Sequence, residues 1–233
     1  MKKLISYSSV ILLLAIVFSA CKKNNIITTP SASLMAFNLI TDKDAVFITL
    51  SGNRLTNTPL GYTSFTGGYL PIYIGSRDVK SIDANTGTTL ALSTKVFADS
   101  MYYSLFTIGK NGSYRNVIAN DSLNKLTIST GQAFVRYINA IPDSTVSPLV
   151  IISSNGSNIV NTTAGFGTVS GFTKVNAGNI NVGVNSGDSI SATRSIAVEE
   201  SKAYTILLTG IPNAADTTKS VKIKYITNGT ITP

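Results

Sequence analysis

Short apolar runs separated by turn-forming residues recur along the chain from about residue 34 to the C-terminus. Within the runs, apolar and polar positions alternate, or the run stays apolar over a few residues. Thr, Ser, Ile, Val and Tyr are frequent there, and Gly, Asn and Asp separate the runs, which is typical of β-strands joined by turns. In the first half, strands are predicted over residues 34–40, 46–50, 70–74, 88–92 and 102–108.

Glycine and asparagine pairs follow many of these runs. Glycine has no Cβ and asparagine tolerates the left-handed region, so such pairs supply the positive φ that tight turns need. Turns are predicted at Gly52-Asn53, Gly67-Gly68, Asn111-Gly112, Asn155-Gly156 and Asn228-Gly229.

The second half of the sequence repeats the order of motifs in the first half. The matched segments are 38–42 with 139–143, 46–52 with 150–156, 68–74 with 178–184, and 103–109 with 204–210. We therefore predict an all-β fold with two tandem immunoglobulin-like β-sandwich domains, over residues 34–130 and 131–233. A single continuous sandwich built from both halves is the alternative.

The order of these motifs resembles the bacterial DUF4397 family over most of residues 34–230. The resemblance implies an exported, often lipid-anchored, β-rich sandwich of unknown activity. The chain departs from the family at its first turn, where the family's frequent Pro-x-Ala is replaced by Thr41-Asp42-Lys43-Asp44-Ala45, and a proline is kept only as Pro142. Because the shared motifs are apolar patterning and turn glycines, no catalytic or ligand residue can be carried over.

The N-terminus has the layout of an export signal, with basic residues, an apolar run too short to span a bilayer, and a small-residue exit. Residues 17–21, Val-Phe-Ser-Ala-Cys, resemble the lipobox of bacterial lipoproteins. We predict a signal peptide over residues 1–20, lipid on Cys21 and a tether over residues 21–33. A lone buried cysteine behind an ordinary secretory signal is the alternative.

Residues beside the predicted lipid indicate where the protein resides. Lys22 is not the aspartate that favours inner-membrane retention, so we expect an outer-membrane lipoprotein. Phe18, where Leu is the commonest choice, resembles the signals of Bacteroidetes lipoproteins. Its facing, towards the periplasm or the cell surface, stays open. The formal net charge is +8, but the basic residues are scattered, which argues against nucleic acid as a partner.

Candidate chemistry is sparse. The chain has no histidine and one cysteine, which removes the usual general base, the imidazole-dependent triads and the commonest metal ligand. We therefore predict no enzyme activity, metal or cofactor. A carboxylate-dependent hydrolase built on Asp42 and Asp44 is the less favoured alternative, since the same pair fits a turn between strands.

Aspartate followed by serine or threonine recurs in a pattern that resembles the O-glycosylation signal of exported Bacteroidetes proteins. The alternative is ordinary Asx-turn chemistry. The acceptor positions would be Ser100, Ser122, Ser144, Ser189 and Thr217.

The tyrosines keep a binding function open although tryptophan is absent. Tyr62, Tyr69, Tyr73, Tyr102, Tyr103 and Tyr114 could form an aromatic strip for sugars or could be core residues. The sequence favours a non-catalytic envelope lipoprotein that acts in binding, adhesion or surface assembly, with a glycan or an envelope protein as partner. A glycan-binding accessory protein and a structural spacer are the alternatives.

Overall fold

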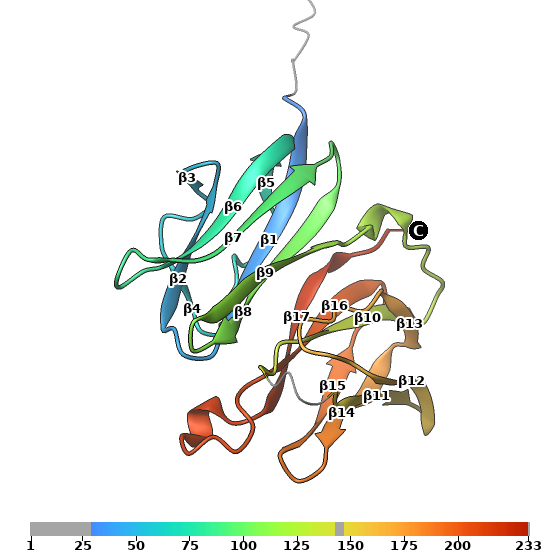
Figure 1. Ribbon diagram of the computed structural model, residues 1–233. Coiled ribbons are helices and arrows are strands. Elements are labelled where there is room, and N and C mark those ends of the chain that lie inside the picture. The colour runs from blue at the N-terminus through green and yellow to red at the C-terminus, as the bar shows by residue number, and fades with distance from the viewer. Residues whose placement is uncertain (1–28, 143–146, 233) are drawn as a thin grey trace, which may run out of the picture.

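The computed structural model describes residues 29–142 and 147–232, and almost all of its regular structure is β-strand (Figure 1). The predicted lipid site, Cys21, and the candidate glycosylation site Ser144 lie outside the described residues. No helix within the described part of the chain is long and apolar enough to cross a membrane.

The first half of the chain forms two sheets that face each other. One sheet has the order β5-β1-β8-β9, and the other has the order β3-β2-β6-β7 with β4 paired to β2. The strands are β1 (Ser31–Ile40), β2 (Ala45–Leu50), β3 (Asn53–Arg54), β4 (Leu60–Gly61), β5 (Leu70–Tyr73), β6 (Gly75–Asp83), β7 (Thr89–Phe97), β8 (Tyr102–Lys110) and β9 (Ser113–Asn120).

The second half repeats this arrangement with sheet orders β13-β10-β16-β17 and β12-β11-β14-β15. In both halves the first strand pairs in parallel with the second-to-last strand of its half, β1 with β8 and β10 with β16. The chain therefore forms tandem β-sandwiches. The strands are β10 (Gln132–Asn139), β11 (Leu149–Ser154), β12 (Ser157–Thr163), β13 (Thr173–Asn176), β14 (Gly178–Ser186), β15 (Ile190–Val198), β16 (Lys202–Thr209) and β17 (Lys222–Thr230); two 3₁₀ turns, η1 (Leu123–Lys125) and η2 (Thr217–Lys219), complete the elements.

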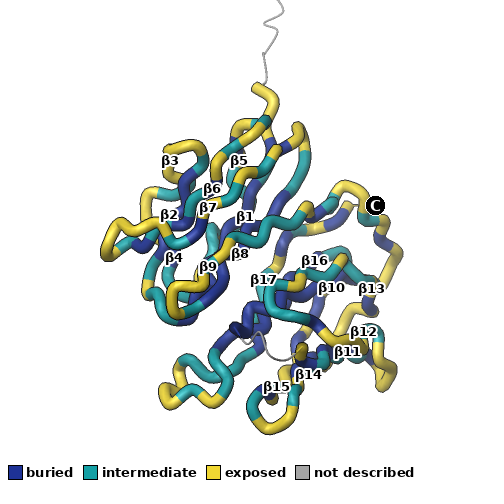
Figure 2. The backbone as a smooth tube through the Cα atoms, viewed as in Figure 1, coloured by how far each residue is buried: buried dark blue, intermediate teal, exposed yellow. Residues whose placement is uncertain are grey.

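The central strands are buried on both faces, as the dark blue segments of Figure 2 show. On β1, Leu34 and Ala36 point into the core of the first sandwich. Met35, Phe37 and Leu39 point the other way and pack against the second half, in a cluster that also contains Ile138 and Leu207. Since each sandwich has its own core and the two share this third cluster, hydrophobic burial holds the halves together.

Equivalent residues make the same contacts in the two halves. Asn38 donates from Nδ2 to the Leu60 carbonyl, and Asn139 donates in the same way to the Ala164 carbonyl. The Tyr103 hydroxyl accepts from the Ala98 amide as that of Tyr204 accepts from the Glu199 amide.

One of the four predicted repeat matches is wrong. Residues 68–74 lead into β5, whose equivalent is β13, because both strands pair antiparallel with the first strand of their sandwich. Residues 178–184 belong to β14, which corresponds to β6. In each half a glycine lies at or just before two successive strands, Gly68 and Gly75 in the first half and Gly171 and Gly178 in the second, so the glycine alone cannot distinguish the strands.

Two local features differ from the sequence prediction, one strand that was missed and one predicted turn that is absent. Strand β6 was not predicted, because its inward positions include Arg77, Ser81 and Asp83 and so show little apolar alternation. Asn228-Gly229 does not form a turn. It lies inside β17, where the pairing register with β16 shifts in a β-bulge.

Candidate functional site

A cluster of buried polar side chains lies between the two sandwiches, at one end of the shared apolar cluster. We call it the interface polar cluster. Its members come from both halves of the chain: Tyr69, Ser104 and Asp121 from the first, and Arg136, Thr205 and Asn228 from the second.

Arg136 is the centre of this cluster. Its side chain is 2% exposed and forms an ion pair with Asp121, with 2.6 Å between Nη1 and Oδ1. Its Nη2 donates to the Ser104 hydroxyl at 2.8 Å, and its Nε donates to the Thr205 hydroxyl at 2.9 Å. The Phe172 ring lies 4.5 Å from the guanidinium carbon. These contacts neutralise the buried cation and give each of its three nitrogen atoms a hydrogen-bond partner, which offsets the strong penalty of burial.

Tyr69 and Asn228 extend the cluster towards solvent. The Tyr69 hydroxyl donates to Asp121 Oδ2 and accepts from Asn228 Nδ2 at 3.1 Å. Burial, followed by the adjacent Asp121 carboxylate, raises the pKa of Tyr69 well above its usual value. The phenol therefore stays protonated and acts as a fixed donor at any physiological pH.

An open groove of about 450 Å³ adjoins the interface polar cluster. We call it the interface groove. The rings of Tyr69 and Tyr102 meet edge to face at its wall, with centroids 5.1 Å apart. Among the residues that the structure describes, no Asp, Glu, Lys or Arg lines this groove. Its lining includes Tyr69, Tyr102, Asn124, Leu126, Asn228 and Thr230.

Further contacts join the two sandwiches away from the groove, towards the other end of β16 and β17. The Tyr62 and Thr209 hydroxyls lie 3.1 Å apart, and Lys224 Nζ donates to the Thr63 hydroxyl at 2.6 Å. Arg115 donates to the Phe166 carbonyl and stacks on the ring of the same residue. The two sandwiches therefore contact each other at several points along the interface, and the groove lies between them at one end.

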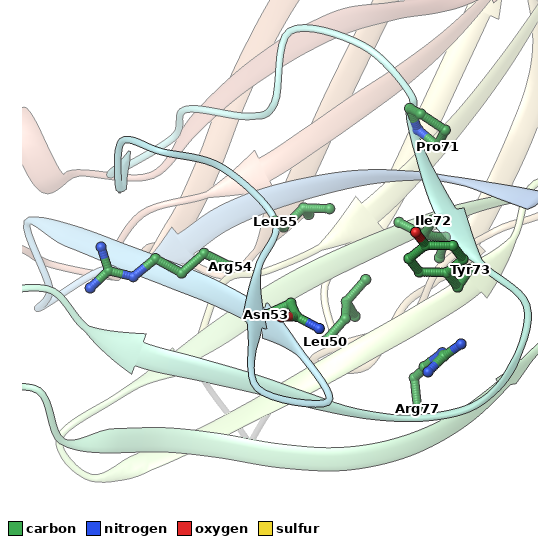
Figure 3. Close-up of a pocket in the computed structure, with 8 residues that line it drawn as sticks. All are labelled: Leu50, Asn53, Arg54, Leu55, Pro71, Ile72, Tyr73 and Arg77. Carbon is green, nitrogen blue, oxygen red and sulfur yellow. The ribbon is translucent and has the colours of Figure 1, made fainter.

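A second, smaller cavity of about 170 Å³ opens at one end of the first sandwich (Figure 3). We call it the sandwich mouth. Leu50, Leu55 and Ile72 form its apolar floor, and Tyr73 and Arg77 stand beside each other at its rim. Arg54 also lines it but points away from the other side chains, towards the Phe47 ring.

The tyrosines singled out in the sequence do not form one strip. Tyr103 is a core residue, and Tyr114 donates to Asp42. Only Tyr69 and Tyr102 meet at a groove, while Tyr73 lies at the rim of the sandwich mouth with 68% of its surface exposed.

The candidate glycosylation positions in the described chain lie on separate turns. Ser100 and Thr217 are exposed, whereas Ser122 and Ser189 are half-buried. Three of the preceding aspartates have structural contacts: Asp99 accepts from the Ser31 amide, Asp216 accepts from the Thr218 amide, and Asp121 pairs with Arg136.

The aspartate pair considered for hydrolysis has a turn role. Asp42 Oδ2 accepts from the Asn111 amide and from the Tyr114 hydroxyl, both at 2.8 Å. Asp44 is exposed on the same turn. Over residues 29–142 and 147–232, no three side chains of His, Cys, Asp or Glu gather in a way that could hold a metal ion.

Sequence reasoning missed Arg136 and Asp121 as a pair. In the sequence Arg136 is only one of the scattered basic residues, and Asp121 is the aspartate before the candidate acceptor Ser122. A signal was present, because Arg136 interrupts an otherwise apolar strand, and a charge in such a strand usually requires a buried partner.

Comparisons with known proteins give one firm match. A search of curated proteins finds no match. The TIE protein of Bacillus anthracis covers 86% of this chain at 12% identity with a TM-score of 0.27, and the match spans 44% of that protein. A proposed cell adhesion protein from Bacteroides eggerthii covers 88% of the chain at 10% identity with a TM-score of 0.26, and the match spans 98% of that protein. At these scores neither likeness bears on fold or function.

The family model is decisive where the structural comparisons are not. The model described as a domain of unknown function, DUF4397, matches residues 32–146 and again residues 133–224. The first match covers the first sandwich and extends over β10, the second covers most of the second sandwich, and together they cover most of the chain. The chain therefore belongs to the DUF4397 family and carries its domain twice.

Proposed function

We propose that this chain is a non-catalytic envelope lipoprotein, held on the outer membrane by lipid on Cys21, that binds a ligand in the interface groove. The observation that carries the proposal is the groove itself, which has a volume of about 450 Å³ and lies beside a saturated polar cluster. Tyr69 in the groove wall is held by hydrogen bonds with Asp121 and Asn228, and a side chain that is already ordered loses little conformational entropy when a ligand binds, which favours affinity. An adhesion or surface-assembly role needs such a site and no catalytic group.

The lining of the groove favours a neutral glycan as the ligand, which makes a glycan-binding accessory role the second candidate. Tyr102 and Tyr69 offer aromatic surface for the apolar face of a sugar ring. Asn124 and Thr230, both exposed, can exchange hydrogen bonds with sugar hydroxyls. A charged ligand would find no counter-charge among the described lining residues.

Replacing Tyr102 with alanine is expected to weaken glycan binding by about tenfold or more, because it removes aromatic surface from the groove. The measurement is a glycan array followed by calorimetry with the sugar that binds. Tyr73→Ala is the matched control, since Tyr73 is an exposed tyrosine outside the groove. Equal loss in both variants, or no loss in Tyr102→Ala, would place the ligand elsewhere.

We also propose O-glycosylation at the exposed acceptors Ser100 and Thr217, which have room for an attached sugar. Ser122 and Ser189 are half-buried and are weaker candidates on that ground. Extra mass in sugar-sized steps on peptides that contain Ser100 or Thr217 supports the proposal, and unmodified peptides from the native cell refute it.

A further inference from the structure

The two sandwiches differ in polarity at equivalent positions of one end. Cross-strand pairing places Arg77 opposite Lys95 in the first sandwich, where the second has Ile180 opposite Ile196. Both isoleucines are core residues with at most 1% of their surface exposed. In the first sandwich, these inward positions therefore hold two cations, and the sandwich mouth opens beside one of them.

The outward positions at this end differ in the opposite sense, because there the first sandwich is the more apolar of the two. Tyr73 is 68% exposed and Val96 is 66% exposed, which makes them two of the three large exposed hydrophobic residues in the described chain. Their equivalents in the second sandwich are Asn176 and Ala197. Apolar side chains thus face solvent where the sister domain has small or polar ones, although exposing them is unfavourable without a partner.

The two cations are available to an anionic group. Arg77 Nη2 donates to the Ile74 carbonyl at 3.0 Å, and its buried Nε has no hydrogen-bond partner. Lys95 lies 5.8 Å from the Tyr103 ring centre. Neither cation forms an ion pair with a carboxylate of the described residues. The nearby carboxylates have other donors: Asp78 accepts from Thr94 and Asp99 accepts from the Ser31 amide.

This end of the sandwich is also where the chain enters the fold. Ser31 pairs with Tyr73, and its carbonyl accepts from the Ser100 amide, just after the end of β7. Figure 1 shows the N-terminal end of β1 at this end of the sandwich. About ten residues separate Ser31 from Cys21, which reach at most about 35 Å when extended. With lipid on Cys21, as the proposed function has it, the sandwich mouth stays close to the bilayer.

We propose that the sandwich mouth is a membrane-contact site for anionic phospholipid. Arg77 and Lys95 bind headgroup phosphate, and Tyr73 and Val96 enter the interfacial layer of the bilayer. Arginine and lysine bind phosphate by charge-assisted hydrogen bonds, and tyrosine is favoured at membrane interfaces. In the cell, the proposed lipid anchor brings the sandwich mouth to the membrane, and the contact then orients the first sandwich there. The binding of the mouth to anionic phospholipid does not itself require the anchor.

The test uses the unlipidated chain from Lys22 onwards, which contains every described residue, and vesicles of phosphatidylcholine with or without an equal amount of phosphatidylglycerol. Sedimentation should show binding to the mixed vesicles alone. Arg77→Gln with Lys95→Gln should weaken it about tenfold or more, because each cation near an anionic surface contributes to attraction. Tyr73→Asn with Val96→Ala, which copies the second sandwich, should also weaken it.

Matched controls and a competitor decide the interpretation. Lys125→Gln with Lys174→Gln removes the same charge at exposed sites elsewhere, and Tyr102→Ser removes a groove tyrosine; both should bind like the unaltered chain. Equal binding by all variants, or no binding by the unaltered chain, overturns the proposal. If free glycerol phosphate bound as tightly as the mixed vesicles, the ligand of the sandwich mouth would be a soluble anion and the proposal would be wrong. The tested chain lacks Cys21, so an absence of vesicle binding would overturn the membrane-contact site without bearing on the lipid anchor, which is tested separately by mass.

Discussion

Replacing Arg136 with methionine is expected to lower the free energy of unfolding by about 3 to 5 kcal/mol, the usual cost of removing one partner of a buried ion pair. The substitution leaves the Asp121 carboxylate buried without its cation. It also removes the Arg136 N–H groups that donate to the Ser104 and Thr205 hydroxyls. For a chain of this size the loss corresponds to a fall in Tm of roughly 10 °C. Chemical denaturation and calorimetry would measure both quantities.

A double-mutant cycle separates the ion pair from simple loss of packing. Asp121→Asn keeps most of the side-chain shape, and the double variant should lose less than the sum of the two single variants, because no uncompensated charge remains. Lys202→Met is the matched control, since its ion pair with Glu199 is at the surface and should contribute little. An Arg136 variant as stable as this control would show that the interface polar cluster does not hold the halves together.

The second large effect is expected at the repeated glycines Gly109 and Gly210. Their φ values are +132° and +110°, which side chains with a Cβ rarely adopt. A Cβ would also overlap the carbonyl oxygen of Ser113 in one sandwich and of Ser220 in the other. Alanine at either position should therefore cost about 1 to 3 kcal/mol in backbone strain and about 1 to 3 kcal/mol more in overpacking.

Glycines without these constraints provide the comparison. Gly68 and Gly171 lack the positive φ, and a Cβ on either would meet no atom within 4 Å. Alanine there should leave the urea midpoint nearly unchanged. If Gly109→Ala unfolded at the same urea concentration as Gly68→Ala, the close approach of backbone at Gly109 would not be a real constraint on the fold.

Much of the fold was predictable because local chemistry specifies it. Ser31–Ile40 and Tyr102–Lys110 form strands close to the predicted ones, and Asn111-Gly112 and Asn155-Gly156 form turns with positive φ at both residues, as predicted. The DUF4397 resemblance rested on the same apolar runs and glycines. These features depend on residues close in sequence, which a pattern can report.

The candidate site was much less predictable, because it depends on packing between the halves. Asp121 and Arg136 are close in sequence, yet their pairing requires β10 to lie against β8 with the outer faces of two sheets in contact. Strand β8 is buried at every position from Tyr103 to Gly109, and its mostly apolar sequence is the local trace of that burial on both faces. Similarly, the cations at Arg77 and Lys95 become informative only when strand pairing identifies Ile180 and Ile196 as their equivalents.

The central claim, a binding module held on the membrane by lipid, is tested most directly by the intact mass of the chain purified from its native cell envelope. The account predicts a chain that starts at Cys21 and carries the added mass of a diacylglyceryl group, with or without a further acyl chain. A chain that starts elsewhere, or that carries an unmodified Cys21, would contradict the claim and remove the physical reason for placing the sandwich mouth at a bilayer.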